Sequence, residues 1–122
     1  MIRGDLWLIR HGETEWSASG RHTSSTDLAL TAEGERKAAA VGRLLAGKTF
    51  ALLLASPLRR ALETCRLAGY SAQVTPDLRE WGYGSYEGLT TAEIQVQNPG
   101  WTIWTAFGPT NVTSTGWPRR PS

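Results

Sequence analysis

The stretch LWLIRHGET at residues 6–14 decides the fold of this chain. An apolar run that ends in Arg10, His11 and Gly12 is typical of a buried β-strand, which we place at residues 5–10. Glycine allows the backbone to turn sharply where the strand ends. Arginine presents a planar fork of donors to phosphate oxygens, and a neutral imidazole is a nucleophile near pH 7. The stretch therefore indicates phosphoryl chemistry.

Length and composition set limits on the class of protein. The chain has 122 residues, enough for one small domain, and its 40% hydrophobic and 20% charged residues are ordinary for a globular protein. The net charge is only +2, without a basic stripe, which argues against nucleic acid as a partner. The single cysteine, Cys65, excludes an intramolecular disulfide and favours a cytoplasmic location. We expect neither a signal peptide nor contact with a membrane.

The first half of the chain reads as strand, loop, helix and strand. A long polar loop covers residues 11–30, and loops of this length are usually functional. Thr31 is expected to cap a helix that runs to about residue 46, where Gly47 ends it. The continuous apolar run at 50–55 predicts a buried parallel strand.

The second half continues the alternation. Ser56 and Pro57 form a predicted N-cap and first turn of a helix that ends near residue 68. A short strand at 73–75 and a Gly- and Tyr-rich loop at 77–89 follow. Thr90 and Glu93 predict a capping box for a helix to about residue 97.

The alternation of strands and helices predicts an α/β fold with a parallel sheet and right-handed crossovers. Ligands bind such sheets beyond the carboxyl ends of the strands. His11 follows the first strand, Ser56 the second and Glu80 the third, and Arg60 lies in the helix after Ser56. We therefore expect these residues to converge on one edge of the sheet.

The string RHGET at residues 10–14, followed by Trp16, resembles the signature of the histidine phosphatase superfamily, also called phosphoglycerate mutase-like. The resemblance implies a three-layer sandwich around a parallel sheet. It also implies phosphomonoester hydrolysis through a phosphohistidine.

Two later motifs extend the resemblance. SPLRRA at residues 56–61 is similar to the family's second motif, and Arg60 matches its phosphate-binding arginine. A helix N-terminus also favours anions through its free N–H groups. LREWGYGSYEG at residues 78–88 resembles the third motif, in which Glu80 matches the general acid and base, while we expect Glu87 to brace the loop. The sequence of this third motif is most similar to that of family members that act on sugar bisphosphates, such as sedoheptulose or fructose bisphosphate.

The resemblance implies a role for each site residue. His11 would take the phosphoryl group, and Glu80 would protonate the leaving oxygen and later activate water. The implied phosphate- or substrate-binding residues are Arg10, Gly12, Thr14, Arg21 and Arg60. No cofactor or metal is expected. His22 is more readily interpreted as a surface histidine of the loop than as a residue that contacts substrate.

The sequence departs from the family pattern in two places. Ser17 stands where the family usually has asparagine. The family's second active-site histidine, which follows a later strand, has no counterpart, because the chain has histidines only at positions 11 and 22.

We interpret residues 1–105 as the N-terminal part of a histidine phosphatase domain and residues 106–122 as a non-matching, disordered tail, the product of a truncated or frame-shifted gene. The fold would then be a truncated sandwich that self-associates through an exposed sheet edge. The predicted activity is hydrolysis of a small phosphorylated metabolite, such as a sugar phosphate, impaired by truncation. The alternatives are an inactive phosphate-binding fragment or pseudoenzyme, and mutase-type phosphoryl transfer.

Overall fold

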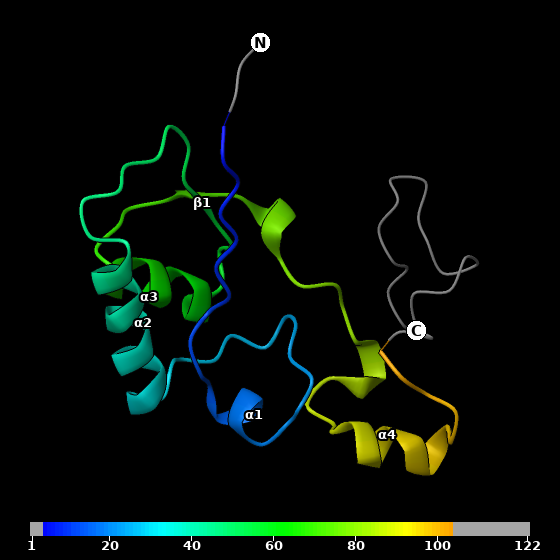
Figure 1. The fold of residues 1–122 in the computed structure, drawn as a ribbon. Helices are drawn as coiled ribbons and strands as arrows, with labels where there is room; N and C mark the ends of the chain where they lie inside the picture. The colour runs from blue at the N-terminus through cyan, green and yellow to red at the C-terminus, as the bar shows by residue number, and fades with distance from the viewer. Residues whose placement is uncertain (1–3, 104–122) are drawn as a thin grey trace.

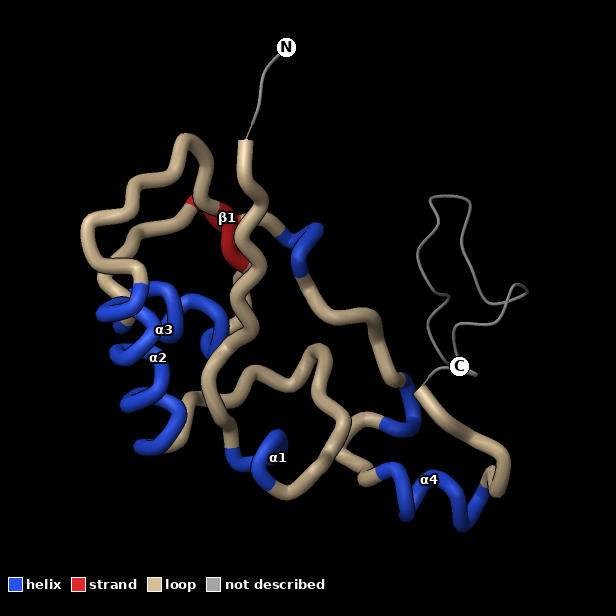
Figure 2. The backbone as a smooth tube through the Cα atoms, in the orientation of Figure 1, coloured by secondary structure: helices blue, strands red, loops and turns tan. Residues whose placement is uncertain are grey.

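The computed structural model describes residues 4–103, and Figure 1 shows the order of the elements along the chain. Helices predominate and the strands are short (Figure 2). The elements are α1 (Glu15–Ala18), α2 (Ala32–Leu44), β1 (Leu54–Ala55), α3 (Arg59–Leu67), β2 (Gln73–Val74), two 3-10 turns (Pro76–Leu78 and Gly84–Tyr86) and α4 (Thr91–Gln97).

A parallel strand pair joined through a helix lies at the centre of the fold. β1 pairs with β2, with Leu54 opposite Gln73. The Gln73 and Thr75 amides donate to the carbonyls of Leu53 and Ala55, each at 2.9 Å. Helix α3 connects the two strands and packs against α2. The predicted parallel α/β fold is confirmed, although the sheet is smaller than expected.

The prediction of a first strand at residues 5–10 is wrong for this structure. The segment runs as an exposed coil without assigned secondary structure. It lies across a hollow from β1, since residues from both line that space. A strand exists only where a neighbour accepts and donates its ladder hydrogen bonds. Leu6 and Leu8 are consequently 84% and 85% exposed.

Two neighbouring boundaries also differ from prediction. The strand expected at residues 50–55 is limited to Leu54–Ala55, because only residues 53–55 reach the β2 backbone. Ser56 is not the N-cap of the next helix. Helix α3 begins at Arg59 after Leu58, and the Ser56 hydroxyl accepts the Leu58 amide at 3.3 Å instead.

The predicted caps of the other helices hold. The Thr31 hydroxyl accepts the Gly34 amide at 3.0 Å at the start of α2, and Gly47 turns the chain with φ of +77°. Thr90 caps α4 by accepting the Glu93 amide at 3.2 Å. Glu93 does not complete a capping box, and its carboxylate lies 3.6 Å from Arg21. The sequence did not predict α1, which Thr14 caps inside the expected loop.

Helix α2 packs through its glycines. A Cβ atom on Gly34 would lie 2.2 Å from the carbonyl oxygen of Glu13, and one on Gly42 would lie 2.6 Å from that of Ala68. Gly34 therefore lets the helix start touch the turn after His11, and Gly42 lets α2 reach the end of α3. Figure 1 shows α2 and α3 side by side, with α4 on the opposite side of the N-terminal segment.

Aromatic rings pack the segment after α4 against the loops beside it. The imidazole of His22 lies 4.9 Å from the Tyr83 ring and 5.2 Å from the Trp101 ring, between centroids. Ile94 of α4 is fully buried. The Gly88 amide donates to the His22 carbonyl at 2.8 Å, which ties the first polar loop to the third motif. Within residues 4–103, no helix has both the length and the apolar character needed to cross a membrane.

We expect Gly42→Ala to destabilise the protein by about 1–3 kcal/mol, the usual cost of overpacking. In a helix interior, alanine is normally more favourable than glycine by about 1 kcal/mol. The sign of the change in the free energy of unfolding therefore tests the contact with Ala68. Urea titration followed by circular dichroism measures it. Gly100→Ala is the control, because a Cβ atom on Gly100 would have no neighbour within 4 Å. A more stable Gly42→Ala protein would contradict the packing of α2 on α3.

Candidate active site

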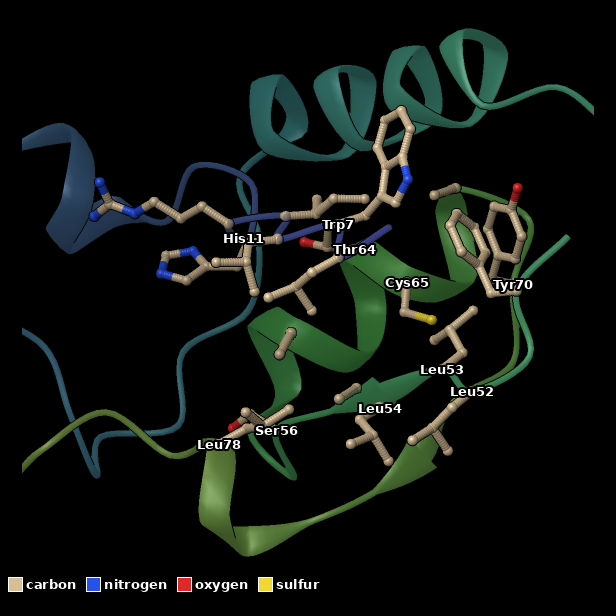
Figure 3. A pocket seen from close by; sticks show the side chains of 18 of the residues that line it. Trp7, His11, Leu52, Leu53, Leu54, Ser56, Thr64, Cys65, Tyr70 and Leu78 are labelled. Carbon is tan, nitrogen blue, oxygen red and sulfur yellow. The ribbon is translucent and has the colours of Figure 1, made fainter. Parts of the chain in front are cut away.

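A hollow with a volume of about 720 Å³ lies between the N-terminal segment, the β1 strand and the α3 helix. Figure 3 shows His11 at one end of it and Tyr70 at the other, with Cys65 and Leu53 nearer to Tyr70. Four of the predicted site residues line the hollow: Arg10, His11, Arg60 and Glu80. Ser56 lines it as well. These residues thus line one hollow, although the strand expected before His11 is absent, and their roles toward a substrate stay predictions.

The His11 ring is oriented by a backbone carbonyl. Its Nδ1 atom lies 2.7 Å from the carbonyl oxygen of Gly12. A carbonyl oxygen can only accept a hydrogen bond, so Nδ1 carries the proton in the neutral ring. The lone pair is then on Nε2, which is the nitrogen left for nucleophilic attack.

The surroundings of His11 favour its neutral form. Burial lowers the pKa of the imidazole, the Gly12 hydrogen bond opposes that change, and the positive charges of Arg60 and Arg10 lower the pKa further. The net shift is downward from the ordinary value of 6.5. The neutral form of His11 is therefore favoured at pH 7.

Arg60 is a buried cation held by backbone carbonyls. Only 4% of the residue is exposed. Its Nη1 donates to the Thr26 carbonyl and its Nη2 to the Ser24 carbonyl, each at 2.9 Å. Burial lowers the pKa of Arg60, yet guanidinium groups ionise so weakly that the charge remains. Arg60 also lines the hollow.

Thr64 links the His11 turn to the α3 helix. Its hydroxyl accepts the Gly12 amide at 2.9 Å and donates to the Arg60 carbonyl at 2.7 Å. This residue was not predicted from the sequence. The available signal was its position four residues after Arg60, which puts both on one face of a helix.

The other predicted groups at this end of the hollow are more open. Arg10 is exposed. Glu80 is exposed too, and its Oε1 accepts the Trp81 amide at 3.2 Å. The Glu80 carboxylate interacts electrostatically with Arg60. An exposed carboxylate beside a fixed cation can exchange protons with a bound phosphoester.

Three predicted binding residues have structural partners instead. The Gly12 amide is bonded to Thr64, as described above. Thr14 is fully buried and forms a capping box with Ser17, the residue that replaces the family's asparagine. Arg21 donates to the Gly88 carbonyl at 2.7 Å. Neither Thr14 nor Arg21 lines the hollow, and their roles toward phosphate stay predictions.

His22 lies outside the hollow, among aromatic rings. Its Nε2 is 3.1 Å from the Thr91 hydroxyl, and burial lowers its pKa. Within the described part of the chain, no group of three or more histidine, cysteine or carboxylate side chains could hold a metal ion.

Comparison with known proteins gives a family match. The model of the histidine phosphatase superfamily, branch 1, matches residues 6–119. An acid phosphatase of Mycobacterium tuberculosis is 48% identical over 103 residues, which cover 82% of this chain and 51% of that protein. The sedoheptulose 1,7-bisphosphatase of Saccharomyces cerevisiae is 36% identical, covering 80% of this chain and 45% of the relative. The chain spans about half the length of the curated relatives it matches.

Solved structures agree with the sequence matches. An open reading frame product of Mycobacterium tuberculosis superposes with a TM-score of 0.75 at 43% identity, covering 92% of this chain and 55% of the other. A putative alpha-ribazole-5'-P phosphatase of Escherichia coli gives a TM-score of 0.68 at 34% identity, covering 76% and 49%. The boundary that we predicted between the domain part and the tail, at residues 105–106, lies outside the residues that the structure describes. The family match and these structures together show that the chain belongs to the histidine phosphatase superfamily, branch 1.

Proposed function

We propose that this chain is a phosphomonoester hydrolase that works through a phosphohistidine at His11. The observation that carries the proposal is the His11 ring itself. Its Nδ1–H is bonded to the Gly12 carbonyl, and its free Nε2 shares the hollow with Arg60, Arg10 and Glu80. A neutral nucleophile beside fixed cations suits attack on a phosphate dianion.

In the first step, Nε2 of His11 attacks the phosphorus atom, and the bond from phosphorus to the ester oxygen breaks. Arg60 and Arg10 stabilise the charge on the phosphoryl oxygens. Glu80, in its protonated form, gives its proton to the leaving alkoxide, which departs as an alcohol. The products of this step are the alcohol, a phosphohistidine and the Glu80 carboxylate.

In the second step, the Glu80 carboxylate accepts a proton from a water molecule, whose oxygen attacks the phosphorus. The bond between phosphorus and Nε2 breaks, and inorganic phosphate leaves. His11 is again neutral and Glu80 again holds a proton, so the cycle is closed.

The proposed substrate is a small phosphorylated metabolite, such as a sugar phosphate. The names of the matched relatives support a phosphomonoester in general, since they include an acid phosphatase, a sedoheptulose bisphosphatase and an adenosylcobalamin/alpha-ribazole phosphatase. Mutases are matched as well, at 37–39% identity, and mutase-type transfer is the competing proposal. The loop motif at residues 78–88 favours the phosphatase.

We expect a 32P-labelled phosphomonoester, quenched rapidly, to label the chain at His11. The label should be stable in base and lost in acid, as expected for a phosphoramidate. His11→Ala should abolish it, while His22→Ala, in the ring cluster outside the hollow, should keep it. Label that persists without His11 would contradict the proposal.

The lowered pKa of His11 predicts the pH dependence of labelling. Attack requires the neutral ring, so the labelling rate should fall as the pH drops through a His11 pKa that lies below 6.5. The stability of the folded chain should change with pH in the same direction. Because His11 binds a proton more readily in the unfolded chain, its contribution to stability is lost as the pH falls. NMR titration of the His11 Cε1–H signal measures the pKa directly. Arg60→Gln should raise it, and a wild-type value above 6.5 would contradict the structure.

Turnover by the 122-residue chain should be low. The resemblance implies a second histidine donor that this chain does not supply, and one missing donor costs about 100- to 1000-fold. Hydrolysis of p-nitrophenyl phosphate measures it, with His11→Ala as the blank. Turnover near 10 per second, an ordinary enzyme rate, would show that another group completes the site.

A further inference from the structure

A carboxylate outside the hollow binds the loop that holds Arg60. Oε1 of Glu87 accepts the Ser24 amide at 2.8 Å and the Thr26 amide at 3.3 Å. Oε2 of Glu87 accepts a short hydrogen bond from the Ser24 hydroxyl. One side chain thus fixes the loop backbone at two positions.

Arg60 binds the same two residues through their other backbone groups. Its guanidinium donates hydrogen bonds to the carbonyls of Ser24 and Thr26. The amides of the same two residues donate to the Glu87 carboxylate. The loop is therefore held between an anion on one side and a cation on the other. Ser24 is only 2% exposed, so water does not compete strongly for these groups.

Glu87 does not touch the candidate reaction centre. It is absent from the lining of the hollow, whereas Arg60 and His11 both line it. Burial acts to raise the pKa of Glu87, but the hydrogen bonds from Ser24 and Thr26 outweigh that effect and bring the pKa below its ordinary value. Glu87 is thus ionised near neutral pH and remains an acceptor for all three donors.

We propose that Glu87 is a positioning residue, which fixes the loop at Ser24–Thr26 so that its carbonyls hold the Arg60 guanidinium beside His11. The proposal rests on the proposed function, since it assumes that Arg60 binds the phosphoryl group. Its physical basis is the shared loop. Without the carboxylate, the two amides lose their acceptor, the carbonyls move, and Arg60 loses its fixed orientation.

The test compares Glu87→Gln with Glu33→Gln in the 122-residue chain. Glutamine keeps the shape of the side chain but turns an NH₂ group toward loop donors. Glu33 is the matched control, because it pairs with Arg36 and Lys37 on the exposed side of α2. Two readouts are used: the affinity for inorganic phosphate by calorimetry, and the exchange rate of the Arg60 guanidinium N–H signals by NMR, assigned through their loss in Arg60→Lys.

In Glu87→Gln we expect phosphate affinity to fall about tenfold, the effect of one misplaced charge-assisted hydrogen bond. The guanidinium signals of Arg60 should exchange faster, while Glu33→Gln behaves as wild type. Phosphate affinity within twofold of wild type together with unchanged guanidinium exchange would overturn the proposal.

Two further outcomes also test whether Glu87 positions Arg60. If Glu87→Gln does not fold, Ser24→Ala is judged by the same readouts; it removes one bond to the same carboxylate and the acceptor of the Tyr83 amide. If the wild-type chain does not bind phosphate, the proposed function fails, and the guanidinium exchange alone decides whether Glu87 positions Arg60.

Discussion

Gly12 is the point on which the other contacts of the site depend. A Cβ atom there would lie 2.6 Å from the Gly34 carbonyl oxygen, so only glycine allows α2 to approach the turn. The Gly12 amide donates to Thr64 of α3, and the Gly12 carbonyl accepts from His11. One residue without a side chain therefore joins the two helices and also sets the tautomer of the His11 ring. A substitution at Gly12 would disturb packing and chemistry together.

The charge of Arg60 is kept available by the kind of partner that holds it. A carboxylate in direct contact would neutralise the guanidinium, and an incoming phosphate would have to displace it. Backbone carbonyls satisfy the N–H groups without cancelling the charge. The carboxylates that offset the charge act from a distance: Glu80 lines the hollow, and Glu87 acts one peptide away, through the loop. This arrangement explains how a residue only 4% exposed can remain both buried and electrostatically active toward the hollow.

The sequence predicted the local features that depend on nearby residues. Thr31 and Thr90 cap their helices, and Gly47 turns the chain shortly after α2 ends, because caps and turns are determined within a few positions. The parallel pairing of β1 with β2 was predicted as well. Placement of His11, Arg60 and Glu80 around one hollow was also predicted. The strand at 5–10 was not found, because an apolar run becomes a strand only when a neighbour completes its ladder. Thr64 was missed because its role arises from a contact 52 residues away along the chain.

The two ends of the hollow are stabilised by different forces. At the His11 end, glycine contacts and hydrogen bonds fix His11 and Arg60, and these contacts are short-range and directional. At the other end the surfaces are apolar, and within residues 4–103 the leucines at positions 6, 8 and 52 are more than half exposed. Apolar burial contributes only when a surface covers the side chains, at about 25 cal/mol per Å². The geometry around His11 is thus set by local bonds, while the apolar end of the hollow is stabilised only to the extent that another surface covers those leucines.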